Sequence, residues 1–135
     1  METAQLLKVL LSWAVTLSSY STPAQLPAVE YKPETYFHEQ ACGGRPCNIL
    51  AWYDNNGTIY MDDRLSQQTD VMTRSMLVHE IVHYLQDLSG KFDNANCEDH
   101  ARREREAYAI QREYGIRASG SVLFIRMVIP PCPQA

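Results

Sequence analysis

One short stretch constrains this chain more than any other: a His-Glu-x-x-His pattern, from His79 to His83, inside an apolar segment. In a helix, residues four apart lie on the same face, so His79 and His83 can direct both imidazoles at one metal ion. Glu80 lies about 100° around the helix from His79, which places its carboxylate near the metal without making it an obligatory ligand. A water held by zinc needs a base beside it, and this spacing supplies one.

The surroundings of the pattern favour a buried metal site. Ile81 and Val82 fill the positions between the two histidines, and Glu80 is the only charged residue between Ser75 and Gln86. Burying two histidines and a glutamate is costly unless they have partners. A zinc ion therefore explains the segment better than the alternative, which is a pair of surface histidines with a neighbouring acid.

A tetrahedral zinc site needs a third protein ligand, with water in the fourth place. A later helix, predicted from Glu98 and stopped by Gly115, offers several acids. At about 100° per residue, Glu104 falls among small and semi-polar residues on a side that can face another helix, whereas Glu106 falls opposite and looks solvated. Glu104 is therefore the predicted third ligand and Glu106 the alternative. His100, about 40° from Glu104, is a further candidate ligand or oxyanion donor, and an exposed or capping position is the preferred interpretation.

The N-terminal segment, residues 1–20, has two interpretations. Its apolar run is typical of a signal peptide, but Glu2 stands where a positive charge belongs and Lys8 interrupts the run. A polar stripe on one side and an apolar face on the other are typical of a helix packed on a core. We predict a helix that backs the domain, with a signal peptide as the alternative. The segment is too short and too polar for a membrane span.

Short strands and turns follow this segment. Residues 28–31 and 35–39 are strand candidates. The sequence Asp-Asn-Asn-Gly at 54–57 is a strong turn signal because Asn and Gly tolerate positive φ, so residues 47–62 predict a β-hairpin. The tail from Val122 to Ile129 is apolar, and its periodicity does not decide between strand and helix.

Helix boundaries can be predicted around the metal motif. Thr69 or Asp70 can cap the start of this helix, and Gly90 can end it. The chain has 135 residues, of which 45% are hydrophobic, and this predicts one domain with a real core. The net charge of −4 and the mixed charges of the Arg102–Arg105 run argue against a nucleic-acid partner.

Four cysteines occur in the chain, and an even number predicts two disulfides and an oxidising compartment, periplasmic or extracellular. Cys42 and Cys47 are the local pair, and a bond between Cys97 and Cys132 would tie the tail to the helix with the third ligand. Free buried thiols are the alternative. A second zinc site is disfavoured, because the spacing is not that of a ribbon or a finger.

The His79 to His83 pattern followed by Glu104-Arg105-Glu106-Ala107 resembles the gluzincin clan of zinc metallopeptidases. In that clan a Glu on a later helix is the third ligand, often within Glu-x-x-Ala, and the gap from His83 to Glu104 looks like the thermolysin-type gap. The chain is similar to the smallest members, the minigluzincin-like single domains.

The resemblance covers about residues 47–115, and Ile59-Tyr60-Met61 also matches the strand that forms the sheet edge before the active-site helix in that family. The chain departs from the family at Tyr108, where many gluzincins place Asp or Asn to orient a ligand histidine. The metzincin pattern is not met, because Gln86 and Ser89 stand where it needs Gly and a third ligand.

The resemblance implies a single zincin-like domain over residues 1–135 in the α+β class, with residues 116–135 as a tail. Its parts are an N-terminal backing helix, a small and mostly antiparallel sheet, an active-site helix and a following helix with the third ligand. It implies a peptide or protein substrate, zinc as cofactor bound by His79, His83 and Glu104, and Glu80 as the general base.

A Tyr or His usually stabilises the oxyanion in such enzymes. The sequence offers six candidates and does not choose among them: Tyr60, Tyr84, Tyr108, Tyr114, His38 and His100. The alternative function is a non-catalytic zinc domain that recognises a peptide or protein partner, with zinc serving stability. Glu80 distinguishes the two, because a structural site has no need of a carboxylate there.

Overall fold

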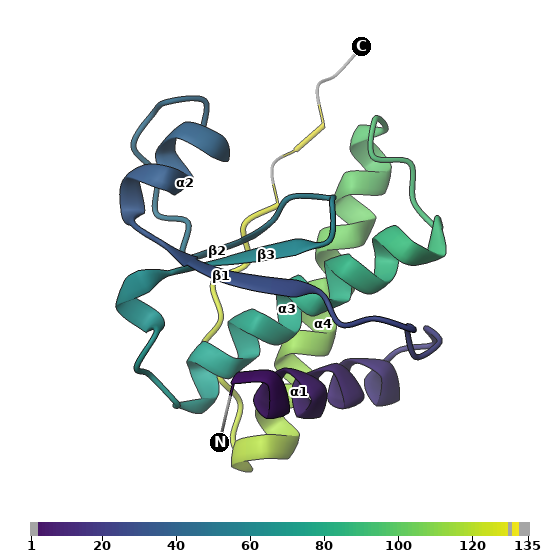
Figure 1. Ribbon diagram of the computed structural model, residues 1–135. Coiled ribbons are helices and arrows are strands. Elements are labelled where there is room, and N and C mark those ends of the chain that lie inside the picture. Colours follow the sequence, from purple (N-terminus) through teal and green to yellow (C-terminus); the bar gives the residue numbers. More distant parts are fainter. Residues whose placement is uncertain (1–2, 130, 133–135) are drawn as a thin grey trace.

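Helices and short strands alternate in the first half of the chain, and two long helices form the second half. The computed structural model describes residues 3–129, 131 and 132, and it belongs to the α+β class (Figure 1). The elements in this part of the chain are α1 (Thr3–Leu17), β1 (Ala28–Lys32), α2 (Glu34–Gln40), β2 (Ala51–Tyr53), β3 (Thr58–Asp62), the 3-10 turn η1 (Asp63–Leu65), α3 (Val71–Ser89) and α4 (Cys97–Ser119).

The three strands form a mixed sheet in the order β1-β3-β2. The hairpin of β2 and β3 is antiparallel, with positive φ at Asn55 and Gly57, as the turn signal predicts. β1 runs parallel to β3, because the chain passes through α2 into β2, which runs opposite to β1, and the hairpin then reverses it again into β3. The expected mostly antiparallel sheet is therefore wrong, and so is the edge position expected for the strand with Ile59, since β3 is central.

Residues 35–39, a strand candidate in the sequence, are helical in α2. Pro33 stands at the N-cap with φ of −69°, and a proline at a helix start favours helical geometry in the residues after it. Phe37 alone of this helix is fully buried, so the segment lacks the alternating burial of a strand. Figure 1 shows α2 on the opposite side of the sheet from α1.

The core lies between the sheet and the helices α1, α3 and α4. α1 buries Leu7, Leu10, Leu11 and Ala14 and contacts both α3 and α4. α3 buries most of its length, which agrees with the apolar residues around the His-Glu-x-x-His pattern. In the described part of the chain, no helix is both long and apolar enough to cross a bilayer.

Caps define the ends of the two long helices. The Asp70 side chain accepts from the Thr73 backbone N–H at the start of α3, and Gly90 ends α3 in the left-handed conformation, as predicted. The sequence predicts that α4 stops at Gly115, but this is wrong, because the helix continues to Ser119. Gly115 lets Leu123 approach the helix closely, since a Cβ there would lie 2.5 Å from the Cδ1 atom of Leu123 and would force that side chain to shift.

The segment after α4, Ser121 to Ile129, is called the tail below, and it is neither strand nor helix. Two disulfides join Cys42 to Cys47 and Cys97 to Cys132, so both predicted pairings are present. Such bonds are consistent with an oxidising environment.

Candidate metal centre

α3 and α4 pack side by side and bring together the three side chains that the sequence predicts as ligands. His79, His83 and Glu104 each offer one ligand atom within 4.8 Å of the other two. The His83 Nε2 atom lies 2.7 Å from Glu104 Oε1, and the His79 Nε2 atom lies 3.1 Å from Glu104 Oε2. The two Nε2 atoms are 3.2 Å apart. These residues come from two helices, so the helix packing itself builds the group.

The group fits a zinc ion. Zinc binds histidine nitrogen at about 2.0–2.1 Å, so ligand atoms around a tetrahedral ion are roughly 3.3 Å apart. The two histidine nitrogens are 3.2 Å apart, close to that value, and the two oxygens of Glu104 lie 2.7 and 3.1 Å from one nitrogen each. Two nitrogens and one carboxylate oxygen also form the donor set that zinc takes in gluzincin-type sites.

Two glutamines orient the histidines. The Gln111 Oε1 atom lies 2.9 Å from His79 Nδ1, and the Gln86 Oε1 atom lies 2.8 Å from His83 Nδ1. An amide oxygen only accepts, so each imidazole donates from Nδ1 and turns Nε2 toward the shared point, where a bound metal would meet its lone pair. The sequence places Gln111 on the inward face of α4 and Gln86 on the site face of α3, but it gives no sign of this pairing.

The electrostatics of the group favour positive charge at its centre. Burial opposes the charge of Glu104, but hydrogen bonds with His79 and His83 hold the pKa of its carboxyl well below the usual range. Burial lowers the pKa of His79, but the hydrogen bond with Glu104 and the charge of Glu80 raise it on balance. A proton on a histidine therefore stabilises the group of His79, His83 and Glu104. A metal cation bound between these three side chains stabilises the group in the same way.

Glu80 lies beside the three ligands and outside their group. Its Oε2 atom is 4.0 Å from His79 Nε2, and its side chain is only 10% exposed. The position agrees with the helical spacing, which turns Glu80 away from a ligand role and keeps it near the metal point.

Glu106, the alternative ligand, lies outside the group of His79, His83 and Glu104. The sequence predicts a solvated side chain, but that of Glu106 is only 25% exposed. It accepts hydrogen bonds from Gln86 Nε2 and Lys91 Nζ, both at 3.0 Å, and from the Tyr20 hydroxyl. Because Gln86 also contacts His83, Glu106 supports a ligand through one intermediate side chain. The expected solvent-facing direction of Glu106 is therefore wrong, because its carboxylate bonds to Gln86 of the neighbouring α3.

Of the six oxyanion candidates, Tyr108 is the one whose side chain contacts a predicted ligand within the described chain. Its ring centroid lies 4.5 Å from that of His79, at an interplanar angle of 62°. The others have different surroundings: Tyr84 donates to the Gln25 carbonyl, Tyr114 packs on Trp13, Tyr60 on Trp52, His38 lies near Glu34, and His100 is exposed.

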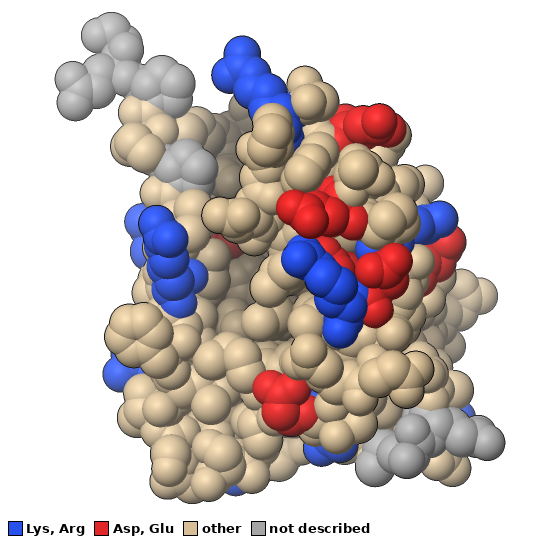
Figure 2. Space-filling view, turned by 90° about the vertical axis from the view of Figure 1, so that its left-hand side faces the viewer, with Lys and Arg blue, Asp and Glu red and all other residues tan. Residues whose placement is uncertain are grey.

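The face of the molecule in Figure 2 is hollowed, and acidic side-chain atoms are visible inside the hollow. Basic side chains lie at its margin. A comparison with protein-family models, with characterised proteins and with solved structures gives no match to this chain.

Proposed function

We propose that this chain is a zinc-dependent metallopeptidase of the gluzincin type, with His79, His83 and Glu104 as ligands and Glu80 as the general base. The observation that supports it best is the convergence of three ligand atoms within 4.8 Å, with a second, buried carboxylate, that of Glu80, beside them. The order of a backing helix, a small sheet, an active-site helix and a ligand helix is the one expected of a zincin-like domain.

The chemistry divides between the metal and the chain. Zinc, when bound, supplies a Lewis acid that polarises a carbonyl and makes a nearby water more acidic. Glu80 accepts the proton of the attacking water and delivers it to the leaving amine. Gln111 and Gln86 keep both imidazoles in the tautomer that leaves Nε2 free.

The position of Glu80 favours an enzyme over a zinc domain that only recognises a partner. A carboxylate that is 10% exposed loses hydration, and a structural site gains nothing from it. A catalytic site needs such a base within reach of the water. A peptide substrate is proposed to enter through the hollow in Figure 2. The two disulfides support an exported protein, periplasmic or secreted, as its setting.

The test is a zinc analysis together with cleavage of a diverse peptide library by the wild type and by Glu80→Gln. We expect one zinc per chain in both proteins and a rate about 10²–10⁴-fold lower in the variant, which is the usual effect of losing a general base. Glu39→Gln is the matched control, because Glu39 is exposed and lies in α2. Equal rates for the wild type and Glu80→Gln, in preparations free of host proteases, would remove Glu80 from the mechanism.

A further inference from the structure

The tail runs back along α4 and contacts it at separated points. Leu123 covers Gly115, where the missing side chain allows a close approach. Farther along, the backbone N–H of Val128 donates to the Tyr108 hydroxyl at 3.1 Å. In Figure 1 the yellow tail rises from the lower end of α4. The tail therefore passes the metal centre on the α4 side.

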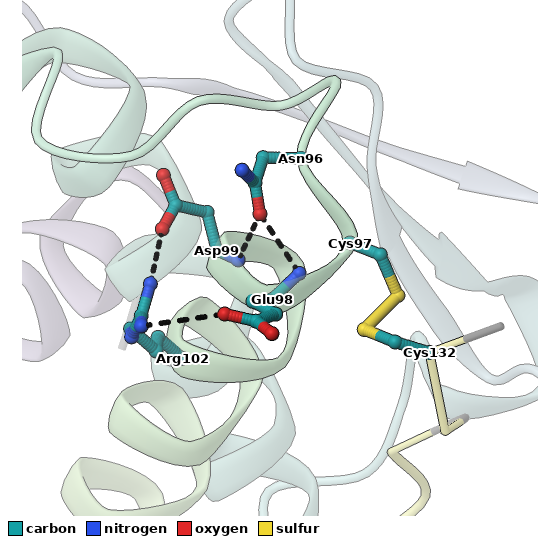
Figure 3. The surroundings of a disulfide bond; sticks show 6 residues. All are labelled: Asn96, Cys97, Glu98, Asp99, Arg102 and Cys132. Carbon is teal, nitrogen blue, oxygen red and sulfur yellow. Dashed lines mark hydrogen bonds and ion pairs between the residues drawn. A yellow bond between two sulfur atoms is a disulfide. The ribbon is translucent and has the colours of Figure 1, made fainter. Parts of the chain in front are cut away.

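A disulfide fixes the chain shortly after the end of the tail. Cys132 is joined to Cys97 at the first residue of α4, next to a helix start that the Asn96 side chain caps (Figure 3). α4 rises about 27 Å from Cys97 to Gly115, at about 1.5 Å per residue. The nine residue steps from Leu123 to Cys132 span at most about 30 Å when fully extended. The segment from Leu123 to Cys132, called the strap, is therefore almost as short as the distance it must cover. The disulfide at its end restricts where Val128 lies.

Tyr108 stands between this strap and the metal centre. Its hydroxyl accepts the hydrogen bond from Val128, and its ring packs against His79 with the centroids 4.5 Å apart. Gln111 holds the same imidazole through Nδ1. The orientation of His79 is thus determined by a hydrogen bond at one ring atom and by packing against an aromatic ring.

We propose that Tyr108 is a positioning residue through which the disulfide-anchored tail holds His79 in its metal-binding orientation. The inference rests on the proposed zinc centre, but it does not depend on peptide hydrolysis. It gives a role to the residue that stands where gluzincins place Asp or Asn. In this chain Gln111 makes the hydrogen bond with the imidazole, and Tyr108 supplies packing in place of an acceptor.

The cross-link is necessary because the tail buries little surface. Val122, Phe124, Met127 and Val128 are all more than half exposed, with Phe124 at 94%. A segment with such exposure and few hydrogen bonds opens readily. When the bond to Cys97 is absent, the strap leaves Tyr108, and the ring is free to rotate away from His79.

The experiment measures the zinc dissociation constant by chelator competition and records the visible spectrum of the cobalt(II)-substituted protein. We expect Cys97→Ser with Cys132→Ser to raise the dissociation constant about tenfold, at the low end of the usual effect of groups that orient a ligand, and to change the cobalt spectrum. The matched control is Cys42→Ser with Cys47→Ser, which removes the other disulfide and leaves both readouts unchanged.

Variants of Tyr108 complete the test. Tyr108→Phe keeps the ring and loses the bond to the tail, so it reproduces the effect of removing the Cys97–Cys132 cross-link. Tyr108→Ala weakens zinc binding at least as much, and adding the two serine substitutions to it produces no further loss, because both act along one path. Amide exchange at Val128 in the zinc-free protein is faster in each tail variant than in the wild type.

Several results would overturn the inference. Removal of the Cys97–Cys132 cross-link with zinc affinity and cobalt spectrum unchanged is one, and full additivity with Tyr108→Ala is another. If the serine pair fails to fold, unchanged zinc affinity and spectrum in Tyr108→Phe overturns it alone. A wild-type protein that binds no zinc refutes the proposed function as well, whereas zinc binding that is insensitive to all tail variants refutes this inference only.

Discussion

Replacing Gln111 by leucine should weaken zinc binding about 10- to 100-fold. The substitution keeps the size of the side chain, which is 4% exposed, and removes the acceptor for His79 Nδ1. When His79 binds the metal through Nε2, its proton must be on Nδ1. In the leucine variant this N–H has no acceptor. In the metal-free state the proton can move to Nε2, which faces Glu104, so the penalty falls mainly on the bound state. An unpartnered buried donor costs about 1–3 kcal/mol, which is roughly 5- to 150-fold in affinity.

The assay is zinc competition against a chromophoric chelator at fixed pH and ionic strength, with circular dichroism to confirm the helical content. Gln111→Glu keeps an oxygen toward Nδ1 and should bind zinc more tightly than Gln111→Leu. Arg112→Ala is the matched control, since Arg112 is the exposed neighbour on the same helix. A folded Gln111→Leu protein with zinc affinity within twofold of wild type would refute the assigned orientation of His79.

Three further outcomes are expected. Glu104→Gln should abolish stoichiometric zinc in mass spectrometry, whereas Glu106→Gln should retain it; the reverse result would move the third ligand to Glu106. In the metal-free protein, the raised pKa of His79 adds stability that is complete below about pH 6.5 and is lost as the pH rises through the pKa of His79 in the folded state. The lowered pKa of Glu104 adds stability that is lost as the pH falls through the pKa of Glu104 in the folded state. Urea titrations should therefore show stability falling above about pH 6.5 while zinc affinity rises, and a flat profile would contradict the charge coupling. Ile81→Ala should reduce the unfolding free energy by about 2–5 kcal/mol, because Ile81 is fully buried; Leu88→Ala, at a 58% exposed position, should change it by less than about 0.5 kcal/mol.

Features that depend on local periodicity were predictable from the sequence. The spacing of His79 and His83 on one helix face, and the inward direction of Glu104, follow from the helical repeat alone. The hairpin follows from the residues that tolerate positive φ at its turn, as Asn55 does. These predictions need no knowledge of which element packs against which.

Features that depend on tertiary contacts were not predictable in this way. The parallel pairing of β1 and β3 depends on which edge of the hairpin β1 joins, and this is a tertiary contact between distant segments. Gly115 is typical of a helix end, but here it accommodates Leu123 within α4. Glu106 is expected to be solvated, but contacts with Gln86, Tyr20 and Lys91 reduce its exposure. The role of Gln111 requires both helices to be in place, because an amide on α4 carries no mark of its partner on α3. Gln86 and His83 are three residues apart on α3, so their contact is compatible with the helical repeat alone.

The packing of α1 has a consequence for how the domain is made. Its apolar residues are covered by α3 and α4, yet α1 is synthesised first and α4 last. At about 5–20 residues per second, the hundred or so residues that follow α1 take roughly 5–20 seconds to emerge. Throughout that interval the Leu7 and Leu10 face lacks at least one of the two helices that cover it. The apolar face of α1 is therefore the part of the core that each nascent chain exposes longest. It is also the surface that chaperones and targeting factors can contact for the longest time.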